Sequence, residues 1–102
     1  MAKFDVYRSL SKDPDIEYLL DVQSDLMSDL RTRVVIPLAP LSSFGTPIAR
    51  LNPVVAVEGE LLALATPNLA GVHVSALGDK VTSLEDHADD ISGAIDFILS
   101  GF

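Results

Sequence analysis

The alternation of apolar and polar residues predicts that most of the chain forms short β-strands. Along residues 3–8, Phe4 and Val6 alternate with more polar neighbours, and a period of two is typical of a half-buried strand. Further strands are predicted at residues 17–22, 32–38, 54–57 and 61–65, of which 32–38 is an apolar run rich in β-branched side chains, and at residues 72–77, where apolar and polar residues alternate. Because Pro37 cannot donate a backbone hydrogen bond, we expect it at a strand end or at a sheet edge.

Turn-forming residues mark the connections between these strands. Gly59 lies between two strand segments, in Glu58-Gly59-Glu60, and its access to positive φ predicts a tight hairpin there. Residues 39–53 contain three prolines and are predicted to form a long connection, with one short helical turn near residues 41–44. A further turn is predicted at Gly78-Asp79.

The last twenty residues change from a strand period to a helical period. Thr82 followed by Glu85 has the form of a capping box, and Gly101 is typical of a C-terminal helix stop. The apolar positions with helical spacing are Leu84, Ala88, Ile91, Ala94, Ile95, Ile98 and Phe102. Strands followed by one helix predict an α+β domain or a partly open barrel.

Composition and charge narrow the choice of partners. The chain has 102 residues, 48% of them hydrophobic, so we expect residues 1–102 to form a single domain. Seven basic residues against fifteen acidic ones give a net charge of −8. This charge disfavours direct binding to nucleic acid or to an anionic membrane surface. It fits a protein partner with basic patches, or simple solubility.

Cysteine content and the N-terminus indicate the compartment. The chain has no cysteine, which excludes disulfides, thiol catalysis and thiolate metal sites and is compatible with a reducing cytoplasm. The N-terminal residues contain no apolar run of signal-peptide length. No segment reaches the roughly 18 apolar residues of a membrane span. We therefore expect a cytoplasmic protein.

Motifs for catalysis or metal binding are weak. His73 and His87 are far apart in sequence, no HxxxH pair occurs, and the G-x-S-x-G motif is missing. We therefore predict no catalytic residue, metal site or cofactor, and a protein that is not an enzyme. Arg31 and Arg33 could bind an anion, but a structural ion pair is the favoured interpretation. Carboxylates near the helix start are explained by the helix dipole: Asp86, Asp89 and Asp90.

Two apolar features admit either a structural or a binding role. Phe102, at the end of the chain, could fold back on the helix or could project and insert into a partner. The adjacent pair Leu26-Met27, among polar and acidic neighbours, leaves the same two interpretations open.

Several motifs resemble the CcdB toxin family. The sequence DVQSD at residues 21–25 is followed by two apolar residues and then by RVVIPL at residues 33–38. The similarity covers essentially the whole chain and continues at PVV (53–55), VxV (72–74), Gly78, Leu84, DIxxAI (90–95) and Gly101.

The resemblance implies both a fold and a function. The fold would be an SH3-like twisted antiparallel sheet, or partly open barrel, with a small accessory sheet and a C-terminal helix, as in CcdB and the related MazF ribonuclease toxins. The protein would be a two-fold homodimer in which the helix ends approach the symmetry axis. It would be the toxin of a type II toxin–antitoxin system, a class linked to plasmid maintenance. It would bind the DNA gyrase A subunit and trap the gyrase–DNA cleavage complex, and a CcdA-like antitoxin would neutralise it.

The resemblance also implies which residues bind gyrase: Leu26, Met27, Asp96, Ser100, Gly101 and Phe102. Three of these depart from the best-known members of the family. Ser100 stands where those proteins have Trp, Phe102 where they have Ile, and Asp96 where they have Asn. Loss of the Trp removes a typical interface anchor.

Two alternative functions stay open at this stage. The protein could have a CcdB-like fold whose target is lost or altered, which the changes at Asp96 and Ser100 motivate. It could also be a MazF-like ribonuclease toxin, although the acidic charge and the few arginines argue against an RNA-binding groove.

Overall fold

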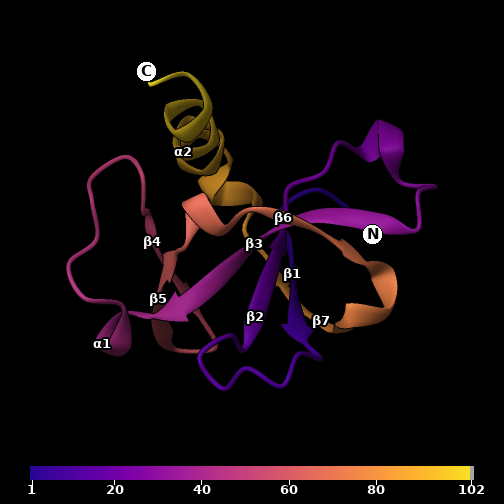
Figure 1. Ribbon diagram of the computed structural model, residues 1–102, viewed down its shortest axis with the longest axis horizontal. Helices are drawn as coiled ribbons and strands as arrows, with labels where there is room; N and C mark the ends of the chain where they lie inside the picture. The colour runs from indigo at the N-terminus through magenta and orange to yellow at the C-terminus, as the bar shows by residue number, and fades with distance from the viewer. Residues whose placement is uncertain (102) are drawn as a thin grey trace.

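Seven antiparallel strands form one curled sheet in the computed structural model, which describes residues 1–101 (Figure 1). The strands are β1 (Asp5–Ser9), β2 (Tyr18–Asp21), β3 (Thr32–Pro40), β4 (Val54–Val57), β5 (Glu60–Leu64), β6 (Ala70–His73) and β7 (Leu77–Ser83). Their order is β4-β5-β3-β2-β1-β7, and β6 pairs with β3 off this path.

The long strand β3 lies between β2 on one side and two successive partners on the other. Val35 pairs with Ala70 of β6, whereas Leu38 pairs with Leu64 of β5. Pro37 lies between these two stretches, inside a central strand, so the prediction of a strand end or sheet edge is wrong. Its carbonyl accepts a hydrogen bond from the Ala65 N–H at 2.9 Å. The position where Pro37 lacks an N–H faces the same side of β3 as this carbonyl. On that side β3 changes its partner from β6 to β5, so no ladder hydrogen bond is required there.

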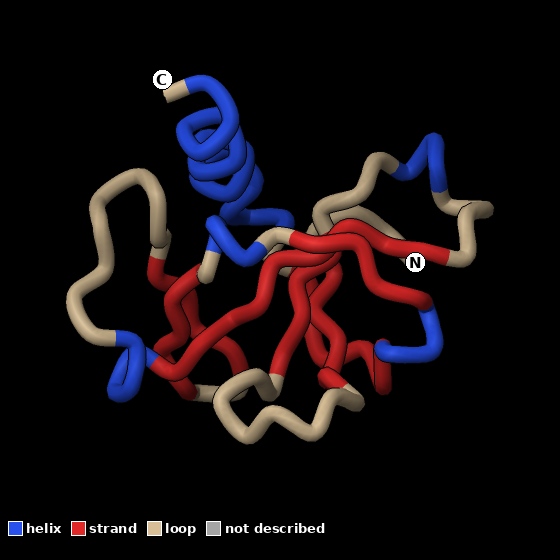
Figure 2. Tube along the Cα trace, viewed as in Figure 1, coloured by secondary structure: helices blue, strands red, loops and turns tan. Residues whose placement is uncertain are grey.

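The sheet curls into a half-barrel, so that strands separated in the sheet order approach each other (Figure 2). Glu58, in the turn between β4 and β5, accepts hydrogen bonds from Arg8 of β1 and Tyr18 of β2, both at 2.7 Å. The turn itself confirms the predicted hairpin, because Glu58 has φ 51° and Gly59 has φ 79°. The short helix α1 (Leu41–Phe44) is also confirmed.

The segment after β6 corrects two predictions. The strand expected over residues 72–77 ends at His73, because the His73 Nδ1 accepts the Ser75 N–H at 3.1 Å and caps a 3-10 turn, η3 (Val74–Ala76). Gly78 and Asp79 form no turn but lie inside β7. A Cβ at Gly78 would lie 3.1 Å from the Arg8 carbonyl oxygen, so glycine allows β7 to approach β1 closely.

The C-terminal helix α2 (Ala88–Ser100) follows a 3-10 turn, η4 (Glu85–His87). Ile91 and Ala94 are fully buried, and Ile91 belongs to the same apolar core as the sheet residues. The predicted capping box does not form, because Thr82 lies in β7 and the Ser83 hydroxyl accepts the Glu85 N–H instead. Antiparallel strands and one C-terminal helix thus confirm the predicted α+β class.

Candidate functional site

Two apolar projections rise above the sheet as separate structures (Figure 1). The first, here called the arm, comprises residues 24–30 and includes the 3-10 turn η1 (Asp25–Met27). The second, here called the helix tip, comprises residues 96–101 at the end of α2. The arm carries Leu26, which is 92% exposed, and the helix tip carries Leu99, which is 74% exposed. Both projections thus present a large apolar side chain to solvent.

The base of the arm is a buried ion pair. Asp21 and Arg33 are both fully buried, and the Arg33 Nε donates to Asp21 Oδ2 at 2.9 Å. The Arg33 Nη2 donates to the same oxygen. The Asp21 Oδ1 accepts the Gln23 N–H at 3.0 Å, which fixes the direction in which the chain leaves β2. The structural ion pair favoured from sequence is therefore confirmed for Arg33, while Arg31 lies exposed.

A second charged group lies on the neighbouring strand β1. The Asp5 carboxylate accepts from the Tyr7 hydroxyl at 3.3 Å and lies 3.3 Å from the Lys80 ammonium group. Burial, reinforced by Asp5, raises the pKa of Tyr7 to about 12. Tyr7 therefore stays protonated as a hydrogen-bond donor at neutral pH.

Gln23 joins the arm to the sheet. Its side chain is 7% exposed, its Nε2 donates to the Met27 carbonyl at 2.8 Å, and its Oε1 accepts the Val34 N–H at 2.9 Å. Both ends of this buried amide are thus satisfied, as buried polar groups require. The carbonyl of Met27 lies at the end of η1, so one side chain connects the far end of the turn to β3.

The remaining residues of the DVQSD motif complete the arm. The Ser24 hydroxyl accepts the Leu26 N–H at 3.2 Å, and the Asp25 carboxylate accepts the Lys3 N–H at 2.8 Å. No residue of η1 is buried. Polar contacts therefore hold the arm, while Leu26 and Met27 remain exposed on it.

The helix tip extends beyond the part of α2 that packs on the sheet. Asp96, Ser100 and Gly101 are all exposed. Gly101 has φ 76° and donates to the Phe97 carbonyl at 2.9 Å, which confirms the predicted helix stop. Phe102, the sixth residue implied by the resemblance, lies outside the described residues.

Leu99 is a candidate that the sequence reasoning missed. The helical stripe predicted from the sequence leaves Leu99 out, although Leu99 lies four residues after Ile95 and continues that spacing. This i, i+4 spacing was the available signal, and the adjacent Ile98 widens the apolar surface of the last turns. In the structure Ile98 is 40% exposed as well, so the helix tip is apolar on more than one side.

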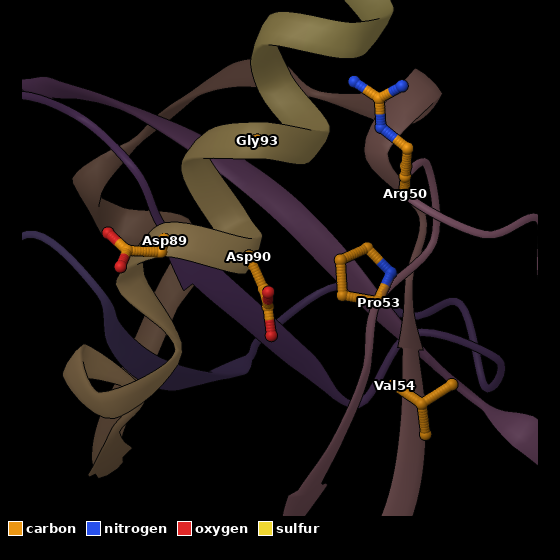
Figure 3. A pocket seen from close by; sticks show the side chains of 6 residues that line it. All are labelled: Arg50, Pro53, Val54, Asp89, Asp90 and Gly93. Atoms are coloured by element: carbon orange, nitrogen blue, oxygen red, sulfur yellow. The ribbon is translucent and has the colours of Figure 1, made fainter.

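A contact from the loop before β4 supports the helix tip at Phe97. The Arg50 guanidinium lies 4.7 Å from the centre of the Phe97 ring, a cation–π distance. Figure 3 shows the Arg50 side chain extending along α2, away from the aspartates at the helix start. The cavity between loop and helix measures about 380 Å³ and is lined by Arg50, Pro53, Val54, Asp89, Asp90 and Gly93.

The described residues form neither a metal-ligand cluster nor a helix suited to cross a membrane. Within residues 1–101, no group of three His, Cys, Asp or Glu side chains is arranged to hold a metal ion. Over the same residues, none of the helices has the length and apolar character needed to cross a bilayer.

These observations describe an α+β domain whose most distinctive surface features are two apolar projections suited to contact with another macromolecule. The family model described as CcdB protein matches residues 3–101 of this chain. The chain therefore belongs to the CcdB family. Members of this family are toxins of toxin–antitoxin systems that act on DNA gyrase, as poisons rather than as enzymes.

Proposed function

We propose that this protein binds the A subunit of DNA gyrase through the arm and the helix tip, and so stabilises the gyrase–DNA cleavage complex. The observation that carries the proposal is that Leu26 and Leu99, the two most exposed large apolar side chains of the described residues, each lie on a projection. A few well-packed, fully desolvated side chains near the centre of an interface supply most of its binding energy.

The proposed mechanism requires binding alone. A protein that has higher affinity for the cleaved state of gyrase than for its other states shifts the enzyme toward that state. The free energy by which the equilibrium shifts equals the difference between the binding free energies for the two states. The protein itself needs no catalytic group for this action.

A homodimer would present two copies of each projection. We propose that residues 1–102 act as one CcdB-like domain and that two copies associate about a two-fold axis near the helix tips. Exposed apolar area at Ile98 supports an isologous contact there. Such a dimer matches a gyrase assembly that contains two A subunits. Because gyrase works in the cytoplasm, the proposal places the protein there.

A CcdA-like antitoxin is the second proposed partner. The family pairs each toxin with an antitoxin, and the net charge of −8 favours a segment that carries basic residues. A segment that folds on binding could cover a large area of this small domain and could be removed by proteolysis.

The helix tip offers other apolar side chains in place of the Trp that the best-known family members have where this chain has Ser100. Leu99 adds an exposed leucine directly beside Ser100, and the sequence ends with the aromatic Phe102. Asp96 adds a negative charge that a basic group on gyrase would complement. An altered target is the second candidate function, and these departures at positions 96 and 100 are what favour it.

A supercoiling and cleavage assay with purified gyrase tests the proposal. We expect the protein to inhibit supercoiling and to increase cleaved DNA, and deletion of residues 100–102 to abolish both effects while antitoxin binding persists. Leu61→Ala is a matched control, because Leu61 is 55% exposed on β5 and belongs to neither projection. In cells, a resistant gyrase A subunit should rescue growth.

Two results would contradict the proposal. Gyrase that turns over normally, with no cleaved DNA, would reject gyrase as the target. If such a protein still killed cells and bound an antitoxin, the altered-target function would be supported instead. Full activity of the truncated protein would reject the helix tip as a binding surface.

A further inference from the structure

The arm has no apolar anchor of its own. None of the residues of η1 is buried, so the arm gains little from hydrophobic packing. The direction in which Leu26 and Met27 point must therefore be set by hydrogen bonds to the rest of the molecule.

Gln23 differs from the other residues that hold the arm. Ser24 and Asp25 make their hydrogen bonds at exposed positions, where water competes for donors and acceptors. The bonds of Gln23 lie in a buried or partly buried setting, where competition from water is weaker. Its link from the Met27 carbonyl to the Val34 N–H fixes the end of the 3-10 turn against β3.

We propose that Gln23 is a positioning residue for partner binding, which holds Leu26 and Met27 in the orientation that the partner recognises. This inference rests on the proposed function, in which the partner is gyrase. Gln23 itself does not contact the partner. It lowers the cost of binding because the arm is already ordered before the encounter.

The test uses Gln23→Glu, which separates the two hydrogen bonds. A glutamate carboxylate still accepts the Val34 N–H, but it cannot donate to the Met27 carbonyl. We expect the affinity for the gyrase A subunit to fall about tenfold. This is roughly the effect of losing one buried hydrogen bond that orders the arm before binding.

A double-mutant cycle distinguishes positioning from a general loss of stability. In a Leu26→Ala/Met27→Ala background the arm has nothing left to position, so Q23E should change the affinity less than about twofold. In a Leu99→Ala background, which alters only the helix tip, the tenfold effect should persist. A purely structural role would give the same loss in all three backgrounds.

Asn52 provides a matched control from another loop. Like Gln23 it is a buried amide, 6% exposed, and it bridges a loop to the sheet. Its Oδ1 accepts the Ile48 N–H at 3.0 Å and its Nδ2 donates to the Leu64 carbonyl at 2.9 Å. Asn52→Asp likewise keeps the acceptor and loses the donor. We expect it to lower the midpoint of thermal unfolding about as much as Q23E, with an effect on affinity that does not depend on Leu26 and Met27.

Amide hydrogen exchange gives a readout that needs no partner. The Met27 and Leu30 N–H groups donate to the Ser24 and Met27 carbonyls within the arm. Their exchange should accelerate about tenfold in Q23E, while amides of α2 and of the 48–52 loop keep their wild-type rates.

The outcomes separate this inference from the proposed function. Faster exchange in the arm, together with a loss of affinity that disappears in the Leu26→Ala/Met27→Ala background, supports Gln23 as a positioning residue. Unchanged arm exchange overturns it, even if the wild-type protein poisons gyrase. If the wild-type protein does not bind gyrase, the proposed function fails and the role of Gln23 in binding fails with it. The exchange rates still show in that case whether Gln23 orders the arm.

Discussion

The arm and the helix tip present similar side chains to solvent, but different forces hold them in place. The helix tip continues a helix whose first turns bury Ile91 and Ala94 in the core, so apolar packing fixes its direction. The arm leaves the sheet above a buried ion pair and is held by hydrogen bonds, chiefly those of Gln23. An exposed apolar group can therefore be oriented either by the core below it or by a few polar contacts.

This difference predicts how each projection responds to substitution. The helix tip should keep its direction as long as the core is intact, because its support consists of many small contacts. The arm depends on a small number of buried polar groups, and the loss of any one leaves an unsatisfied partner. The arm should therefore be the more sensitive of the two projections.

The largest expected effect comes from removing the ion pair under the arm. Arg33→Met leaves the Asp21 carboxylate buried without its cation, and we expect the free energy of unfolding to fall by about 4 kcal/mol. Urea denaturation followed by circular dichroism measures this change.

Two control variants accompany that measurement. Arg31→Met removes an exposed arginine from the same strand region and should change stability by less than about 0.5 kcal/mol. Replacing both partners, in Asp21→Leu/Arg33→Met, should recover part of the loss because no unpaired charge remains. A loss below about 1 kcal/mol for Arg33→Met would show that the pair does not support the arm.

A smaller effect is expected when the exposed leucine of each projection is replaced by alanine. Leu26→Ala and Leu99→Ala remove exposed side chains, so each should leave the free energy of unfolding within about 0.5 kcal/mol of wild type. Each should weaken binding to the gyrase A subunit by about tenfold or more, measured by calorimetry. Because the projections are separate, the two losses should add in the double variant to within about 0.5 kcal/mol. Strong non-additivity would mean that arm and helix tip act as one surface.

The effect expected to be smallest at neutral pH concerns Tyr18 of β2, whose hydroxyl donates to Glu58 in the turn between β4 and β5, outside both projections. Burial, followed by the hydrogen bond to Glu58, raises the pKa of Tyr18 from 10.0 to about 12. Between these two values the unfolded chain releases the proton while the folded protein retains it. Stability from this group is therefore complete below pH 10.0 and is lost as the pH rises toward about 12.

Thermal unfolding at a series of alkaline pH values tests this sign. The Tm of the wild-type protein should decrease over that range, and the Tm of Tyr18→Phe should decrease less steeply. Some decrease should remain in the variant, because the pKa of Tyr7 is also raised to about 12. Arm exchange rates, referred to the intrinsic rate at each pH, should not follow the Tyr18 titration. An unchanged slope in Tyr18→Phe would contradict the assignment.

The sequence by itself determined the local elements and the family. Apolar runs and period-two alternation predicted most of the strands, Gly59 predicted the hairpin, and Gly101 predicted the end of the helix, because these features depend on neighbouring residues and on backbone φ. The DVQSD and RVVIPL motifs indicated CcdB, and the family match over residues 3–101 confirms this.

Only the tertiary structure decided how distant segments meet. It placed Pro37 at the junction of two partner strands, set Gly78 against β1, paired Arg33 with Asp21, and joined Gln23 to both Met27 and Val34. It also showed that Leu99 is exposed. Sequence periodicity reports which face of an element is apolar, but the partner of a buried polar group is chosen by packing between strands far apart in the chain.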